Sequence, residues 1–254
     1  GTAPCANDTA RLTTTVREAP VAGSNRSVEV CSDAAVFNLR DSLGGSPDAG
    51  GTWAGPLGAH SGLFQPATDP GGAYVYSVPG QAPCLAATAT VTVVLRPAPD
   101  AGTSVNLVKC SNEAPFNLLS QLGGTPDAGG AWTGPGGSPF PSGTFTPGTN
   151  TPGLYTYTVP GLAPCGPATA TINISLVAAP KAGINGSHTV CSSEGAFALF
   201  SHLGGLPDVG GAWTGPTGPV PLGSFIPGTD LPGVYTCLVS GTAPCANATA
   251  TVTV

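Results

Sequence analysis

The sequence predicts an all-β protein of three tandem sandwich domains, because one pattern of about 80 residues occurs three times. Each copy opens at a cysteine, continues through Phe-x-Leu and Leu-Gly-Gly-x-Pro-Asp-x-Gly-Gly-x-Trp to Gly-x-Tyr, and closes with Ala-Pro-Cys and alternating Thr and Val. The opening cysteines are Cys31, Cys110 and Cys191. This period suits a small domain with its own core and is too long for one unit of a solenoid.

The repeats also set the expected domain boundaries. Residues 1–16 nearly copy residues 241–254, the end of the third repeat, so we expect the chain to begin with a final strand whose own domain is missing. The domain plan is therefore an extra strand followed by three repeats: 1–16, 17–96, 97–176 and 177–254. Short junctions that contain proline, at 96–102 and 177–183, predict semi-rigid links between neighbouring domains.

Within the second repeat, turn residues and alternating polarity predict each element. Gly, Pro and Asp mark the turns, and a stretch in which small or polar residues alternate with apolar ones has the period of a strand. The expected strands are 105–110, 116–118, 131–133, 143–146, 154–159 and 168–177, with a single helical turn at 119–122. Six or seven short strands in a domain of this size are typical of a β-sandwich.

Composition excludes several classes of function. Only 8% of the residues are charged, and the net charge is −6 with seven Lys and Arg. Nucleic-acid binding requires a basic patch, and anionic membranes attract basic clusters, so we expect neither partner. No run of 18 apolar residues occurs, and we expect no membrane insertion.

Cysteine spacing predicts a disulfide framework. Six of the eight cysteines form pairs at a nearly constant separation, one pair for each repeat. Zinc is disfavoured because no CxxC motif or neighbouring histidine supports a four-ligand cluster. We therefore expect an oxidising, extracellular environment and one disulfide within each domain: Cys31–Cys84, Cys110–Cys165 and Cys191–Cys245.

These motifs resemble the tandem immunoglobulin-like or PKD-like repeats of large secreted bacterial surface proteins, the adhesins of gliding bacteria of the Bacteroidota type. The likeness is carried by Leu-Gly-Gly-x-Pro-Asp-x-Gly-Gly-x-Trp and by Gly-x-Tyr-x-Tyr-x-Val followed by Pro-Cys and Thr-Val-Thr-Val, and it covers essentially the whole chain. It implies three immunoglobulin-like domains in a semi-rigid rod at the cell surface. Such modules serve as spacers, stalks or adhesive surfaces.

Candidate catalytic residues find no support. His60, His188 and His202 occupy non-equivalent places in their repeats, and neither Gly-x-Ser-x-Gly nor His-Glu-x-x-His occurs. We expect surface or loop histidines, no catalytic residue and no enzymatic activity.

Two recurring side chains receive a structural interpretation with an alternative. We expect the aspartates of Pro-Asp-x-Gly-Gly to bond their own turn, and the tryptophans to fill the core beside the disulfide. No cofactor is expected; the alternatives are calcium at the aspartates and a sugar-stacking row of exposed tryptophans. The residues are Asp48, Asp127 and Asp208, with Asp69, Asp230 and Glu113 as further carboxylates, and Trp53, Trp132 and Trp213.

Short motifs predict glycosylation. Five asparagines begin Asn-x-Ser/Thr, and two Asp-Ser/Thr-aliphatic motifs match the pattern that the resemblance makes an O-glycan site. The candidates are Asn7, Asn25, Asn173, Asn185 and Asn247, together with Thr9 and Ser42.

The two remaining cysteines, Cys5 and Cys237, suggest assembly. A Cys5–Cys237 bridge would lock a head-to-tail contact in which the N-terminal strand of one subunit docks on the third repeat of the next. The alternatives are a chain cut from a longer repeat protein, with Cys5 paired upstream, and a buried thiol at Cys237.

The leading functional hypothesis is a structural subunit or segment of an extracellular fibre, stalk or filament. Its partners would be copies of itself in a polymer or neighbouring repeats of a longer chain. The alternatives are an adhesin module that binds carbohydrate, such as surface glycans, or protein, and the non-catalytic spacer of a secreted enzyme.

Overall fold

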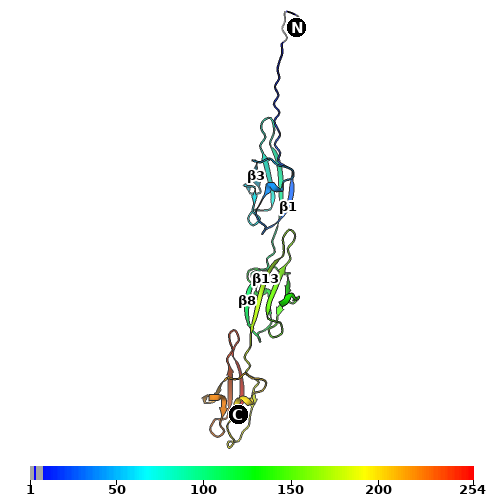
Figure 1. The fold of residues 1–254 in the computed structure, drawn as a ribbon. Coiled ribbons are helices and arrows are strands. Elements are labelled where there is room, and N and C mark those ends of the chain that lie inside the picture. The colour runs from blue at the N-terminus through cyan, green and yellow to red at the C-terminus, as the bar shows by residue number, and fades with distance from the viewer. Residues whose placement is uncertain (1–2, 4–7) are drawn as a thin grey trace. The chain divides into compact units, whose positions relative to one another are not determined.

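The computed structural model describes residue 3 and residues 8–254, and each of its strands lies within one repeat (Figure 1). Every repeat contains one large sheet and one two-stranded sheet. In the first repeat the large sheet has the order β1-β7-β6-β3-β4. Its elements are β1 (Arg26–Cys31), β2 (Phe37–Asn38), η1 (Leu39–Ser42), β3 (Thr52–Gly55), β4 (Gly58–His60), β5 (Leu63–Phe64), β6 (Gly72–Val78) and β7 (Ala87–Arg96).

The second and third repeats follow the same plan, with large sheets of the order β10-β12-β13-β8 and β14-β20-β19-β16-β17. The second repeat contains β8 (Val105–Cys110), β9 (Phe116–Asn117), η2 (Leu119–Gln121), β10 (Ala131–Thr133), η3 (Pro135–Gly137), β11 (Thr144–Phe145), β12 (Gly153–Val159) and β13 (Ala168–Val177). The third contains β14 (Gly186–Ser187), β15 (Phe197–Ala198), η4 (Leu199–His202), β16 (Ala212–Gly215), β17 (Gly218–Pro219), η5 (Pro221–Gly223), β18 (Ser224–Phe225), β19 (Val234–Val239) and β20 (Ala248–Thr253). The predicted fold class, three immunoglobulin-like β-sandwiches, is confirmed.

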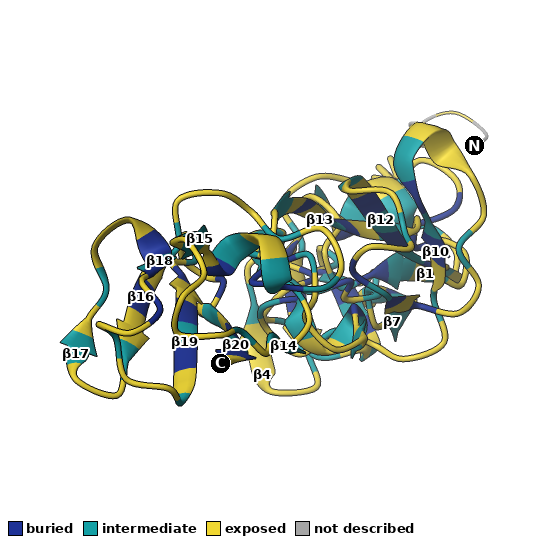
Figure 2. Cartoon of the chain, turned by 90° about the horizontal axis from the view of Figure 1, so that it is seen from below, coloured by how far each residue is buried: buried dark blue, intermediate teal, exposed yellow. Residues whose placement is uncertain are grey.

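The core of each repeat is aromatic and lies between its two sheets. Alternate residues of β12 and β19 are buried, as expected for strands with one face in a core (Figure 2). In the second repeat Phe145 of the small sheet meets Tyr155 of the large sheet edge-to-face, with ring centroids 5.5 Å apart. Trp132 and Tyr157 pack with centroids 4.9 Å apart, and both are buried. The prediction that the tryptophans fill the core is thus confirmed, but their expected place beside a disulfide is not, because the core cluster around Trp53 contains no cysteine.

One tyrosine in each repeat fixes the turn that precedes its strand. The hydroxyl groups of Tyr74, Tyr155 and Tyr235 donate to the carbonyl oxygen four residues upstream at 2.7 to 2.8 Å. Burial raises the pKa of all three phenols. Since each hydroxyl proton is used in a hydrogen bond to the backbone, we interpret the three tyrosines as structural residues.

The first strand of each repeat runs parallel to its last strand. In the first repeat Arg26 pairs with Val91 and Cys31 pairs with Arg96, the last residue of β7. In the second repeat Cys110 pairs with Val177 in the same way. The opening cysteine therefore lies where the chain leaves its repeat.

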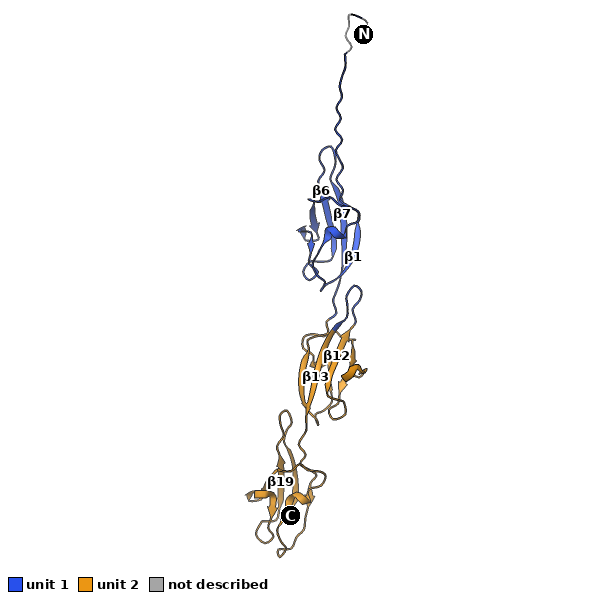
Figure 3. Cartoon of the chain, viewed as in Figure 1, with its two compact units in different colours: residues 1–99, 160–168 blue, residues 100–159, 169–254 orange. Residues whose placement is uncertain are grey.

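Two compact units divide the chain, and the boundary cuts through the second repeat (Figure 3). The first unit holds residues 1–99 and 160–168, and the second holds residues 100–159 and 169–254.

Among the described residues there is no helix with the length and apolar character needed to cross a membrane.

The extra N-terminal strand is not observed in the part of residues 1–16 that the structure describes. Residues 8–16 are exposed and belong to no sheet. A strand needs a ladder partner, and the equivalent residues of β7 pair with β1 and β6 of their own repeat. Among the described residues no strand pairs with residues 8–16, so the copied sequence alone does not make a strand.

Candidate functional site

Two disulfides join consecutive repeats and form the most distinctive site of the molecule. Cys31 bonds to Cys165, and Cys110 bonds to Cys245, at sequence separations of 134 and 135 residues. We call each of them an inter-repeat staple. The predicted pairs Cys31–Cys84, Cys110–Cys165 and Cys191–Cys245 are therefore wrong.

Strand direction explains why a pair within one repeat does not form. Cys31 lies beside the end of β7, whereas Cys84 precedes the start of the same strand. Ten residues of extended chain span about 30 Å. The Cα atoms of a disulfide lie only about 4.4–6.8 Å apart, so the two cysteines of one repeat are out of reach of each other.

The second cysteine of each repeat is presented by a hairpin connection, which we call the cysteine loop (residues 79–86, 160–167 and 240–247). In the second loop the Cys165 N–H donates to the Leu162 carbonyl at 2.9 Å, which closes a turn around a cis Ala163–Pro164 bond. A Cβ at Gly161 would lie 2.2 Å from the Gly166 carbonyl oxygen. Glycine is needed there because the two sides of the loop approach so closely.

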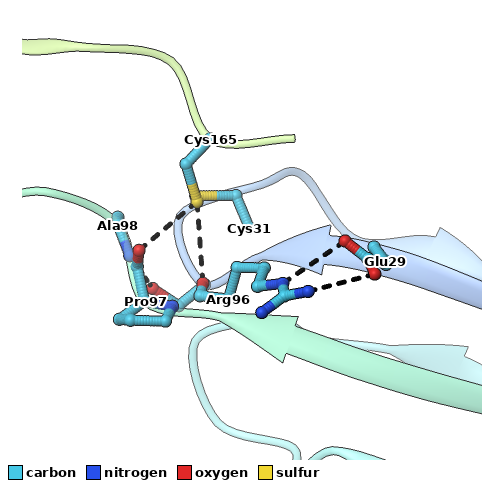
Figure 4. The surroundings of a disulfide bond; sticks show 7 residues. Glu29, Cys31, Arg96, Pro97, Ala98 and Cys165 are labelled. Atoms are coloured by element: carbon cyan, nitrogen blue, oxygen red, sulfur yellow. Dashed lines mark hydrogen bonds and ion pairs between the residues drawn. A yellow bond between two sulfur atoms is a disulfide. The ribbon is translucent and has the colours of Figure 1, made fainter. Parts of the chain in front are cut away.

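The cysteine loop of the second repeat contacts residues 96–97, where the chain leaves the first repeat; we call this segment the exit of the repeat. Cys165 Sγ lies 3.6 Å from the Arg96 carbonyl oxygen and 3.4 Å from that of Pro97 (Figure 4). A disulfide sulfur has no proton, so these are packing contacts. Cys31 and Cys165 are only 5% and 6% exposed, which shields the bond from reductant. Cys245 contacts the carbonyls of Val177 and Ala178 in the same manner.

Hydrogen bonds hold the exit itself in place. The Ser32 N–H donates to the Arg96 carbonyl at 2.8 Å, and the Ser32 hydroxyl accepts from the Ala98 N–H at 2.9 Å. Arg96 also pairs with Glu29 across the parallel strands at 3.1 Å (Figure 4). Ser111 repeats the serine contacts in the second repeat. The residue after the opening cysteine therefore belongs to the site, although its role was not predicted from the sequence.

The recurring aspartate ties the incoming junction to its own repeat. Asp127 Oδ2 accepts from the Asp100 N–H at 2.9 Å, and the Asp127 N–H donates back to the Asp100 carbonyl at 2.7 Å. Asp48 and Asp208 bind Val21 and Lys181 identically. The expected bond within the aspartate's own turn is thus replaced by a bond to the junction, 27 residues upstream.

Asp127→Ala is expected to destabilise the second repeat by about 1 kcal/mol, because a hydrogen bond to a charged acceptor is lost at an exposed site. Asp127→Asn should lose less, since the amide oxygen still accepts. Chemical denaturation read by hydrogen exchange in peptides of the second repeat measures both. Equal losses for the two variants would contradict the hydrogen-bonding role.

The other carboxylates have hydrogen-bond partners as well. Asp69 Oδ2 accepts from the Gln65 N–H at 2.7 Å and lies 3.3 Å from His60 Nε2, and Asp230 Oδ2 accepts from the Ile226 N–H. Glu113 pairs with Lys109. Calcium at Asp48, Asp127 or Asp208 stays an untested alternative to the expected absence of a cofactor, and a calcium-dependent rise in melting temperature would support it.

One group of described residues has the proximity of metal ligands: Cys31, Asp33 and Cys165. Two of its three members are consumed by the disulfide between them. The group is therefore part of the staple.

The predicted glycan acceptors lie mostly at the surface. Asn25, Asn173, Asn185, Asn247 and Thr9 are exposed, Ser42 is half-buried, and Asn7 lies outside the described residues. The side-chain oxygens of three asparagines accept backbone hydrogen bonds, from Thr90, Thr251 and Gly241 for Asn25, Asn185 and Asn247. Their modification stays a prediction.

The histidines are half-buried, and two of them form a pair in the third repeat. His188 and His202 stack with ring centroids 3.9 Å apart, against the ring of Phe197. Burial, and secondarily the neighbouring His188, lowers the pKa of His202. The expectation of plain surface histidines is corrected here, because stacking removes one ring face from water.

We expect the third repeat to lose stability as the pH falls below about 6.5, the ordinary pKa of histidine. The folded pKa of His202 is lowered, so the unfolded chain binds more protons, and the loss is complete below the folded pKa. His202→Gln, which copies Gln121 of the second repeat, should flatten the dependence. Thermal unfolding between pH 8 and pH 5 measures it; an unchanged slope in the variant would count against the pair.

Three cysteines in the described part of the chain are free: Cys84, Cys191 and Cys237. Cys237 is fully buried in the core of the third repeat, and burial raises the pKa of its thiol. It therefore does not fit the predicted bridge to another subunit, and the alternative of a buried thiol is confirmed. Cys5 lies outside the described residues.

A groove of about 430 Å³ lies at the exit of the third repeat. In the first two repeats the corresponding edge pairs with residues 94–96 and 175–177. In the third repeat the register places Ser187 opposite Thr253, close to the last residue of the sequence. The groove is lined by Thr189, Val190, Ser192, Phe225, Leu231 and Val254, among others.

Comparison with known proteins adds little to these observations. No family model matches the sequence, and no curated protein matches it. The I-band fragment I67–I69 of titin is similar over 93% of this chain and 98% of its own, at 13% identity and a TM-score of 0.38. Sidekick-1 immunoglobulin domains 1–4 are similar over 92% of this chain and 75% of their own, at 14% identity and a TM-score of 0.30. Drosophila OTK extracellular domains 3–5 are similar over 92% of this chain and 96% of their own, at 14% identity and a TM-score of 0.28.

The repeats are immunoglobulin-like. Because the sequence identities and TM-scores are so low, that description rests on the strand topology of this chain.

Proposed function

We propose that this chain is a structural segment of an extracellular fibre, stalk or filament, whose repeats are held in series by inter-repeat staples. The observation that carries the proposal is the pairing of Cys31 with Cys165 and of Cys110 with Cys245. A disulfide within a domain would stabilise only that domain. A disulfide between consecutive repeats instead bypasses the junction between them, so the linkage has two covalent paths.

Several features support this role. The junction is fastened on both sides, by Ser32 to Ala98 and by Asp127 to Asp100, which favours a semi-rigid spacer. Buried disulfides persist in oxidising compartments, which favours an extracellular location. Only 8% of the residues are charged, and His60, Asp69 and Asp127 are engaged in hydrogen bonds that hold local structure. These features favour a non-catalytic protein.

The adhesin alternative has less support from the aromatic residues. Trp53, Trp132 and Trp213 are each 7–8% exposed, so they do not offer a sugar-stacking row. A glycan array probed with the oxidised chain tests this alternative. Saturable binding to a defined glycan would favour an adhesin.

The proposal is tested on the cells that produce the protein, with an antibody against the second repeat and electron microscopy of the intact cells. We expect label outside the cell envelope. We also expect the double variant Cys31→Ser/Cys110→Ser to be secreted but to lose its label under shear after brief protease treatment, while the wild type keeps its label, because without the staples a cut backbone has no second covalent path. Label confined within the cell, or equal shear resistance of the variant, would overturn the proposal.

A further inference from the structure

Two free cysteines occupy positions that are disulfide-bonded elsewhere in the same chain. Cys84 stands in the cysteine loop of the first repeat, where the later loops carry Cys165 and Cys245. Cys191 opens the third repeat, as Cys31 and Cys110 open the first and second. Each thus stands at a position that is stapled in the other repeats, and neither is bonded in the described part of the chain.

Cys84 has the geometry of a loop cysteine in a formed staple. Its Sγ lies 3.7 Å from the Arg17 carbonyl oxygen, and the corresponding contacts of Cys165 and Cys245 measure 3.6 and 3.4 Å. Arg17 is the positional equivalent of Arg96 and Val177, the last residues of β7 and β13, because each lies three residues before the junction proline. The loop thus already touches the segment that leads into its own repeat.

Cys191 and the serine that follows it match the opening cysteines of the formed staples and their serines. Its side chain is exposed, whereas Cys31 and Cys110 are buried by their partners. The following Ser192 is equivalent to Ser32 and Ser111, which accept the junction N–H in the formed staples. Ser192 also lines the groove of the third repeat described above.

We propose that Cys84 and Cys191 are complementary sites for neighbouring repeats of this same sequence type. Cys191 bonds to the loop cysteine of a repeat that follows, and Cys84 bonds to the opening cysteine of a repeat that precedes. The proposal rests on the geometry of the staples and is independent of the fibre role. The neighbouring repeat belongs either to a longer form of this chain or to a second copy of it.

Bond formation requires a disulfide oxidant, such as oxidised glutathione or a protein thiol–disulfide oxidoreductase. The Cys191 thiolate attacks the oxidant and forms a mixed disulfide, which releases one oxidant thiol. The loop-cysteine thiolate then displaces the second oxidant thiol and forms the staple. Two protons and two electrons pass to the oxidant for each staple formed.

The test is a fusion of one full-length copy with residues 15–254 of a second copy, so that Val254 is followed directly by Thr15. This joint restores the strand register, because Val254 corresponds to Ile174 and Thr15 to Ser175. After oxidation in a glutathione buffer, disulfide mapping should find Cys191 of the first copy bonded to Cys84 of the second. If both remain reduced while Cys31–Cys165 and Cys110–Cys245 form in each copy, the proposal is overturned.

A second arm with unfused chains identifies the source of the neighbour. A Cys84→Ser chain and a Cys191→Ser chain are oxidised alone and together, with the internal staples as the control for folding. A dimer that appears only in the mixture, joined through Cys191 and Cys84, supports a second copy as the neighbour. A staple found in the fusion alone supports a longer chain, and dimers of wild-type chains joined through two Cys84 residues contradict the proposal.

Discussion

Pulled from its two ends, the oxidised chain is expected to extend to less than half the contour length of the reduced chain. With both staples intact, the shortest covalent route runs through residues 1–31, 110–165 and 245–254. This route holds roughly 100 residues and spans about 330 Å when extended, against about 870 Å for the whole chain. Single-molecule force spectroscopy before and after reduction measures both lengths.

Two cysteine variants distinguish disulfides between repeats from disulfides within repeats. Cys165→Ser removes one staple and should lengthen the oxidised chain to about 410 Å. Cys84→Ser should leave the length unchanged, because Cys84 belongs to neither staple. A longer extension in Cys84→Ser would show that Cys84 is bonded and that the inter-repeat assignment is wrong.

The largest loss of stability from a single core substitution is expected at Tyr157. Its ring packs on Trp132, and its hydroxyl donates to the Asp127 carbonyl at 2.7 Å and accepts from the Gly130 N–H at 2.8 Å. Tyr157→Cys removes a buried ring and should destabilise the second repeat by about 3–5 kcal/mol. Tyr157→Phe removes only the hydrogen bonds and should cost about 1–3 kcal/mol.

The third repeat supplies a matched control, because Cys237 occupies the same place opposite Trp213. Cys237→Ala deletes only a sulfur atom and should cost about 1 kcal/mol. Denaturant unfolding followed by hydrogen exchange in each repeat gives the three values. If Tyr157→Cys proved no worse than Tyr157→Phe, ring packing would not be the dominant contribution.

The fold was predictable from the sequence because its signals are local. Alternating residues in 168–177 gave β13 with the bounds that the structure has, and 105–110 gave β8 equally well. The strand predicted at 1–16 is not found in residues 8–16, the part that the structure describes continuously. A strand also depends on partners that lie far away in the sequence.

Disulfide pairing was not predictable from spacing. Because the repeats follow one another at a nearly constant offset, the separation from Cys31 to Cys84 and that from Cys31 to Cys165 are equally regular along the chain. The parallel pairing of β1 with β7 decides between them, because it places Cys31 at the exit of its repeat. That pairing depends on strand direction, which the residue pattern does not specify.

The two staples overlap along the chain, and this has a consequence for damage. The first encloses residues 32–164, and the second encloses residues 111–244. A protease that cuts any one peptide bond between Cys31 and Cys245 therefore leaves both fragments attached through sulfur. In an environment rich in secreted proteases, a nicked molecule would remain one piece until a reductant reached a buried bond.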